Sequence, residues 1–268
     1  MAIHKDREMV EYDPEQYWSK VGQEIQKRDQ CDVAGYDDPV SRYRRDKFLQ
    51  TFLDTIDFRD ARVLEVGCGP GGNLKHIAER RAPQALIGVD ISQTMINIAA
   101  QNVAAYKGVE LYRINGKKLP FEDQSIDISF TVTVLQHVTD EEMLTALVQE
   151  ICRVTKTQIV LMEEIGTTKE LSAEGSFTTR QVDAYKSLCE ENGFKFADVS
   201  FLNTKISRLW LLSVMYTHKR FVNARRQEGE PISRALRLVI EWPMFITCYF
   251  DRVFKEKRDL AKMTLDRA

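Results

Sequence analysis

The run Gly67-Cys68-Gly69-Pro70-Gly71-Gly72 constrains the fold of this chain more than any other feature. It comes after an apolar segment at 63–66 and precedes an amphipathic segment that carries Leu74, Ile77 and Ala78. This order predicts a buried parallel strand, a tight turn, and a helix that begins on the turn. The glycines allow the backbone to turn sharply and a ligand to come close. The start of the helix offers free N–H groups and a positive dipole end to an anionic group.

Glu65 indicates which kind of ligand suits this turn. The spacing of Gly67, Gly69 and Gly72 also fits a dinucleotide fingerprint, so the glycines alone leave a nicotinamide enzyme open. A carboxylate two residues before the first glycine would repel a pyrophosphate, whereas it suits an ammonium group. S-adenosylmethionine (SAM) carries an α-amino group, an α-carboxylate and a sulfonium, so it fits better than NAD does. A glycine turn without any ligand is the structural alternative.

An acid after the next apolar run favours the same ligand. Ala85–Val89 is expected to form the second buried strand, which Asp90 ends. Asp90 lies 18 residues after Gly72, near the spacing at which an acid accepts hydrogen bonds from ribose hydroxyls. A buried acid is costly without a partner, and ribose is the partner that we expect. Ser92 is expected to cap the next helix.

The segment Glu65–Gly71 resembles the first motif of the class I (Rossmann-like) SAM-dependent methyltransferases of small-molecule type. The resemblance extends over 60–217 and includes Asp90, a Leu-Pro-Phe segment at 119–127 and a Gln-His turn at 136–137. It implies an α/β fold, with a doubly wound, seven-stranded, mostly parallel Rossmann-like sheet, N-terminal helices and a helical C-terminal extension. The implied domains are an N-terminal helical cap at 1–58, a SAM-binding core at 59–217 and the extension at 218–268.

The resemblance also implies a set of cofactor contacts. Family members commonly bind the adenine amino group through a side chain four residues before the Leu of the Leu-Pro-Phe segment. That position is Asn115 here, where the family often has Asp, and an amide oxygen can still accept. The other implied cofactor-binding residues are Glu65, Gly67, Cys68, Gly69, Asp90, Ile91, Gly116, Thr133 and Arg44.

His137 is the candidate general base. It comes after the expected fourth strand at 126–132, and its unperturbed pKa near 6.5 suits proton removal at neutral pH. In several sugar and natural-product O-methyltransferases a His at the matching place acts in this way. The alternatives are a packed or surface His, or a group that only positions the substrate. Glu163 and Glu164, after the expected fifth strand, either contact substrate or are solvated. No metal is expected, because too few oxygen ligands can be assembled.

Residues 1–60 predict two helices, broken around Gly35–Pro39. The helices either cover the edge of the sheet or close over the cofactor. In the second case a cation of the segment 41–45 would meet the SAM carboxylate, and Arg44 is the residue assigned to it, although no motif identifies which one is involved. The polar loop 165–177 is long enough to be a lid. Alternation at 194–201 and at 209–216 predicts two strands in an antiparallel hairpin.

The last 50 residues leave three possibilities open. The apolar segment 239–250 is too short to span a bilayer, and Pro243 interrupts it. It packs on the core as a pocket cover, forms a homodimer interface, or lies on a membrane surface. In the third case 219–258 would contact anionic lipid, because 218–268 holds about 12 Lys and Arg against about 7 Asp and Glu.

The bulk properties exclude some classes of partner. The net charge of −2 and pI near 6.2 give no global attraction to nucleic acid, so no nucleic-acid partner is expected. The five cysteines form no metal-binding pattern and indicate reduced thiols, so we expect a cytoplasmic protein. The first residues show no apolar core of the kind expected for a signal peptide.

The sequence as a whole predicts a SAM-dependent methyltransferase. It would methylate an O or N atom of a small-molecule acceptor, such as a sugar, a natural product or a lipid-linked glycan, and release S-adenosylhomocysteine (SAH). The alternatives are a SAM-binding protein without turnover and a membrane-surface methyltransferase of the lipid or quinone type.

Overall fold

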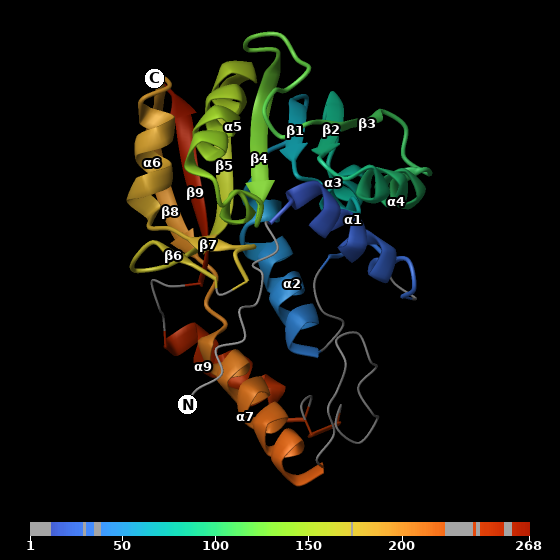
Figure 1. The fold of residues 1–268 in the computed structure, drawn as a ribbon, viewed down its shortest axis with the longest axis vertical. Helices are drawn as coiled ribbons and strands as arrows, with labels where there is room; N and C mark the ends of the chain where they lie inside the picture. The colour runs from blue at the N-terminus through green and yellow to red at the C-terminus, as the bar shows by residue number, and fades with distance from the viewer. Residues whose placement is uncertain are drawn as a thin grey trace, which may run out of the picture.

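A seven-stranded sheet organises the chain, in the strand order β3-β2-β1-β4-β5-β9-β8. The computed structural model describes residues 12–28, 31–34, 39–172, 174–222, 238–239, 242–254 and 259–268 (Figure 1). Strands β1 to β5 are parallel, and β9 is antiparallel to both of its neighbours. The strands are β1 (Arg62–Val66), β2 (Ala85–Asp90), β3 (Val109–Arg113), β4 (Ile126–Val132), β5 (Thr155–Ile165), β8 (Phe194–Phe201) and β9 (Asp259–Arg267). The predicted seven-stranded, mostly parallel α/β fold is confirmed.

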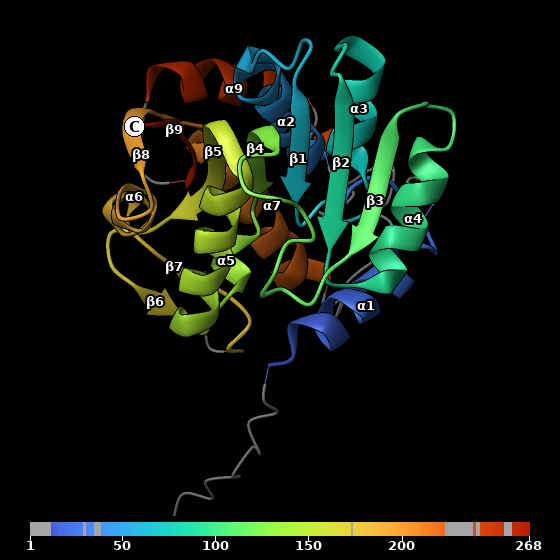
Figure 2. The same ribbon diagram turned by 90° about the horizontal axis from the view of Figure 1, so that it is seen from above.

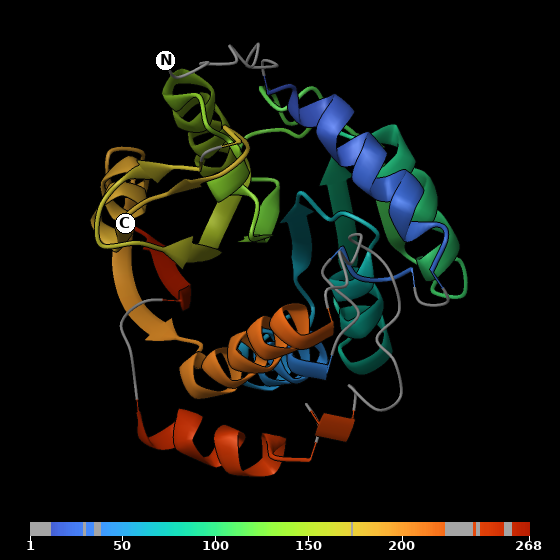
Figure 3. The same ribbon diagram turned by 60° about the horizontal axis from the view of Figure 1, so that its bottom comes forward.

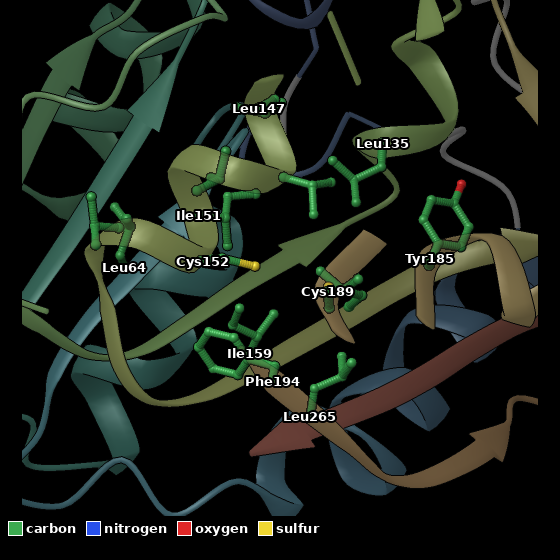
Figure 4. Close-up of a cluster of buried hydrophobic side chains, with 14 of the residues drawn as sticks. Leu64, Leu135, Leu147, Ile151, Cys152, Ile159, Tyr185, Cys189, Phe194 and Leu265 are labelled. Atoms are coloured by element: carbon green, nitrogen blue, oxygen red, sulfur yellow. The ribbon is translucent and has the colours of Figure 1, made fainter. Parts of the chain in front are cut away.

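Helices cover both faces of this sheet. Alternate side chains of β1 point to opposite faces, as the pleat of a strand requires. Leu64 belongs to a core with the helices α5 (Glu141–Val154) and α6 (Val182–Glu190), part of which Figure 4 shows. Val63 belongs to a second core with α3 (Gly72–Arg80). The two apolar layers explain why the central strands read as continuous apolar runs.

Three further helices complete the layers around the sheet. The helix α4 (Gln93–Val103) begins after Ser92, whose hydroxyl accepts a hydrogen bond from the Met95 N–H as expected. α1 (Pro14–Ile25) packs on α4 through the buried Ile25 (Figure 2). α2 (Pro39–Thr51) contributes Phe48 to the core on the α3 side. The predicted break around Gly35–Pro39 lies mostly outside the described residues.

The predicted strand at 209–216 is wrong, because these residues lie in the helix α7 (Lys205–Val222). The antiparallel partner of β8 is instead β9, at the end of the chain, which lies between β5 and β8. Its alternate residues Ala261, Met263 and Leu265 are fully buried. The error has a physical cause, since a short apolar run cannot be assigned to helix or strand by its periodicity alone.

The helices α7 and α9 (Met244–Val253) therefore form an insertion between strands β8 and β9. They are not the helical C-terminal extension predicted at 218–268, because the last residues of the chain form β9. α9 packs against α7, and α7 contacts α2. Both inserted helices lie beyond the carboxyl ends of the parallel strands (Figures 1 and 3). Within the stretch 219–258, residues 223–237, 240–241 and 255–258 lie outside the described part of the chain. No helix in the described residues is both long enough and apolar enough to cross a membrane.

The loop 165–177 holds one strand of a small hairpin, formed by β6 (Glu170–Leu171) and β7 (Thr178–Thr179). Thr178 and Thr179 pair in this hairpin, and α6 begins after Gln181 without a side-chain cap.

Candidate functional site

The glycine turn joins β1 to α3 in the predicted order. Gly67 has a φ of 73°, and a Cβ there would lie 2.4 Å from a methyl group of Val134. Gly69 has a φ of 51°, and a Cβ built there would meet no atom within 4 Å. The first glycine is therefore required by conformation and packing, whereas the space beside the second is open to a ligand. The N–H groups of Gly67 and Cys68 both donate to the Val89 carbonyl, which ties the turn to β2.

Glu65 is buried beneath this turn with one oxygen atom unsatisfied. Its side chain is 1% exposed, and its Oε1 accepts a hydrogen bond of 2.6 Å from the Asn73 amide. The other oxygen, Oε2, has no hydrogen-bond partner. Burial raises the pKa of Glu65 to about 8, although the Asn73 hydrogen bond and the charge of Arg45 act in the opposite direction. A buried unsatisfied acceptor indicates a missing partner, and Glu65 lines a cavity from which one can arrive.

Asp90 links the end of β2 to the same turn. Its Oδ2 accepts from the Gly69 N–H and its Oδ1 from the Ser92 N–H, each at 2.9 Å. Burial raises the pKa of Asp90 to about 6, and these backbone hydrogen bonds partly offset the rise. Each carboxylate oxygen can accept a second hydrogen bond. Asp90 is therefore placed to accept from a ligand while it holds the turn.

Two cavities meet at the glycine turn, and they differ in character. Gly67, Gly69, Val132 and Thr133 line both of them. The apolar cavity is also lined by Trp18, Asp90, Ile91, Met95, Ile114, Gly116, Val134, His137, Met143 and Leu147. The polar cavity is also lined by Arg42, Arg44, Arg45, Phe48, Glu65, Cys68, Asn73, Glu164, Leu202 and Leu260. Together they form a site with one apolar end and one charged end.

Thr133 lies where the two cavities join. It has a φ of 54°, a conformation that is rare for a β-branched residue. Its N–H donates to the Met162 carbonyl at 2.8 Å, and its hydroxyl donates to the Val132 carbonyl at 2.7 Å. The hydrogen bond to Met162 of β5 thus holds this strained conformation at the carboxyl end of β4.

His137 ends the short helix η2 (Leu135–His137), beside the apolar cavity. Its Nδ1 lies 2.9 Å from the Ser176 carbonyl oxygen. That oxygen can only accept, so Nδ1 carries the hydrogen and Nε2 keeps a lone pair, which the Gln136 amide nitrogen approaches at 3.5 Å. The Trp18 ring stands nearly perpendicular to the imidazole, with ring centres 4.8 Å apart. Burial lowers the pKa of His137, which favours the neutral form that a base requires.

Glu163 holds the backbone that carries His137. Its side chain is fully buried, and its Oε1 accepts from the Thr131 hydroxyl at 2.7 Å and from the Val134 N–H at 3.2 Å. Its Oε2 accepts from the Gln136 N–H at 3.3 Å, and burial raises its pKa to about 7. Of the two acids near the carboxyl end of β5, Glu163 therefore supports the turn, whereas Glu164 lines the polar cavity.

Comparisons with known proteins agree with this geometry. Residues 63–158 match a family described as a methyltransferase domain. This part of the chain is a methyltransferase domain, and it lies within a Rossmann-like sheet. It is 35% identical over 108 residues to an uncharacterised 37.1 kDa transposon protein of Streptomyces fradiae (40% of this chain, 31% of that protein). It is 32% identical over 97 residues to a fatty-acid O-methyltransferase of Mycolicibacterium smegmatis (35% of this chain, 34% of that protein).

A solved structure extends the likeness of fold to nearly the whole chain. The magnesium protoporphyrin IX methyltransferase of Synechocystis with bound SAM superposes with a TM-score of 0.57 at 15% identity, covering 95% of each chain. The chain spans about a third of the length of the curated relatives named above.

Two residues expected at this methyltransferase site lie elsewhere or have other partners. Asn115 is exposed, lines neither cavity, and its Oδ1 accepts from the N–H groups of Lys117 and Lys118 at 3.0 and 3.2 Å. Arg44 lines the polar cavity, but it donates to Glu164 at 2.9 Å. The adjacent Arg45 reaches the glycine turn instead, since it donates to the Asn73 side chain.

Sequence reasoning missed Arg180, which is 2% exposed and also supports the His137 turn. Its guanidinium donates to the carbonyls of Leu135 and Val138 at 3.0 and 2.8 Å, and to Glu141 at 2.8 Å. The only signal in the sequence was a lone Arg in a polar segment. Among the residues that the structure describes, no cluster of His, Cys, Asp or Glu could hold a metal ion.

Proposed function

We propose that this protein transfers the methyl group of SAM to an oxygen or nitrogen atom of a small-molecule acceptor. The observation that carries the proposal is the unsatisfied Oε2 of Glu65, which is buried yet lines a cavity. A dinucleotide would bring phosphate toward this carboxylate, whereas the amino group of SAM would satisfy it. SAM supplies an electrophilic methyl group, and SAH is the product.

The residues of the two cavities divide the binding of SAM between them. Glu65 accepts from the amino group at the charged end. Asp90 accepts from the ribose hydroxyls with the lone pairs that the Gly69 and Ser92 N–H groups leave open. The apolar side chains around Ile91, Gly116 and Leu147 enclose the adenine ring. SAH therefore makes the same contacts as SAM, except for those to the methyl group, which it lacks.

His137 accepts the proton that an acceptor hydroxyl loses when it is methylated. Its Nδ1–H is committed to the Ser176 carbonyl, so its Nε2 is the atom that takes the proton. Thr133, on the wall shared by both cavities, marks the place where acceptor and methyl group meet. Glu163 and Arg180 act only through the backbone of the 134–138 turn, and we regard them as positioning residues.

Calorimetric titration with SAM, SAH and NADH tests the proposal. We expect SAM and SAH to bind and NADH not to bind. Glu65→Gln removes the negative charge at nearly constant shape, and it should weaken SAH binding by about tenfold or more. Glu110→Gln, on the exposed face of β3, is the matched control and should leave the affinity unchanged. NADH binding, or equal SAH affinity in both variants, would refute the proposal.

A further inference from the structure

The inserted helix α9 is amphipathic, but its apolar face is exposed and its polar face is buried. Its apolar side chains are exposed and recur at helical spacing, with Trp242 just before the helix 77% exposed and Tyr249 62% exposed. The other exposed members of this stripe are Ile246, Phe250, Val253 and Phe254. A surface helix of a soluble protein normally buries such residues, and a cluster of exposed large apolar side chains marks a surface that meets a partner.

Hydrogen bonds to α7 fix this orientation. Asp251 is 1% exposed and accepts from the N–H groups of Ile206 and Ser207 at 2.7 and 3.2 Å. The Ser207 hydroxyl also donates to Asp251, and Thr247 is buried on the same side of α9. Because the polar face of α9 caps the start of α7, its apolar face has to point outward. A rotation of α9 would leave the Asp251 carboxylate buried without partners, which is costly.

The charges on these helices select an anionic partner. Among the described side chains of α7 and of 242–254, the exposed charged residues are Lys205, Arg208 and Arg252, all of them cationic. The one acid, Asp251, is buried. α7 adds exposed apolar residues at Leu209, Leu212 and Tyr216. Aromatic and aliphatic side chains combined with basic residues are typical of helices that lie in the headgroup region of an anionic membrane.

Both ends of the insertion border the polar cavity. Leu202, just before α7, and Leu260, just after the α9 segment, line that cavity. The Leu202 N–H donates to the Leu260 carbonyl at 2.8 Å, which closes the insertion at the wall of the cavity. α7 and α9 lie at the end of the molecule toward which the parallel strands point (Figure 1). A surface bound by the insertion would therefore lie near the mouth of the methyl-transfer site.

We propose that the exposed apolar face of α7 and α9 docks on an anionic lipid membrane. The docking depends only on this exposed face and does not depend on methyl transfer. The associated acceptor class rests on the proposed function and is an amphiphile that carries its hydroxyl or amino group at the membrane surface. The helices lie in the interface and do not span the bilayer, since α9 has only 10 residues and no helix in the described part of the chain is both long enough and apolar enough to span it.

Vesicle co-sedimentation without SAM tests the docking. The full chain should bind vesicles of phosphatidylcholine mixed with phosphatidylglycerol, and bind vesicles of phosphatidylcholine alone at least about fivefold more weakly. Tyr249→Ser combined with Val253→Ser should reduce binding about tenfold or more. Leu171→Ser, at an exposed leucine on the β6 hairpin, is the matched control and should bind like the parent.

A second variant tests the attraction between the basic residues and anionic lipid without removing any apolar side chain. Arg252→Gln should lower binding to the anionic vesicles by about fivefold and leave the circular dichroism spectrum unchanged. Equal binding to both kinds of vesicle, or no binding to either, would overturn the docking. A dimer in light scattering that the double substitution dissociates would overturn it in favour of a second copy of this chain. SAH titration of the same samples separates a failure of docking from a failure of the proposed function.

Discussion

The raised pKa of Glu65 predicts that ligand affinity depends on pH. A pKa that moves from 4.5 to about 8 means that ionising Glu65 in the empty site costs about 5 kcal/mol more than ionising a glutamate in water. Between about pH 6 and pH 7 the ionised fraction rises from about 1% to about 9%, so the association constant of SAH should rise about ninefold. The rise should end near about pH 8, where Glu65 is ionised and the α-amino group of the ligand begins to lose its own proton.

Isothermal titration with SAH at several pH values, in two buffers with different heats of ionisation, measures both the affinity and the protons released. The wild-type protein should release close to one proton on binding near about pH 6.5. Glu65→Gln should lose most of this dependence. The remaining carboxylate, Asp90, has a pKa of about 6 and gives less than a twofold change over the same range. An affinity that stays constant with pH, or the same slope in both proteins, would refute the reasoning.

The same shift has a consequence for the protein without ligand. The folded-state pKa of Glu65 lies above its unfolded value, so its contribution to stability is fully present below pH 4.5. That contribution is lost as the pH rises toward 8. At pH 8 the ligand-free Glu65→Gln variant should therefore unfold at a higher urea concentration than the wild type does.

Single contacts give four further predictions. Asp90→Asn should weaken SAH binding by about tenfold in calorimetry, because the amide offers the ribose fewer acceptors, and unchanged affinity would exclude the ribose role. His137→Ala should lower kcat by about a hundredfold with little change in SAH affinity, and lost SAH binding would remove the support for a base. Arg180→Met leaves buried carbonyls unpaired and should cost about 2–4 kcal/mol in urea unfolding, whereas a change below about 0.5 kcal/mol would contradict its role as a brace. Gly67→Ala should be more destabilising than Gly108→Ala, since both have positive φ but only Gly67 has a side chain 2.4 Å from the new Cβ.

Sequence reasoning predicted the parallel part of the fold because its signals are local. The strands at 62–66 and 85–90 are apolar runs that end at a glycine turn and at an acid, and each is succeeded at once by a helix with its own start signal. The same holds for Glu65 and Asp90, which the structure brings to the glycine turn. Asp90 accepts from the Gly69 N–H, and Glu65 accepts from the Asn73 side chain at the start of α3. These residues are close in space because adjacent parallel strands end at the same edge of the sheet.

The antiparallel edge could not be read in the same way, since its pairing is non-local. Residues 202–258 separate β8 from β9, and nothing near 194–201 indicates that its partner is at the end of the chain. The apolar run at 209–216 lies at the place where a hairpin partner is usually found, but it carries a helical pattern with one exposed face.

The supporting side chains of the site were hidden for a related reason. Glu163 and Arg180 act through backbone groups of the turn at 134–138, and no spacing in the sequence connects them to it. Asn115 shows the opposite case. Its position in the sequence matches the family, but its side chain closes its own turn onto the N–H groups of the next residues.

A crystal structure of the protein with SAH would show directly whether Glu65 binds the amino group of the ligand. We predict that the amino nitrogen of the ligand lies about 3 Å from Oε2 of Glu65 and that the ribose hydroxyls donate to Asp90. A ligand bound with its amino group elsewhere, with Oε2 of Glu65 still without a partner, would contradict the account.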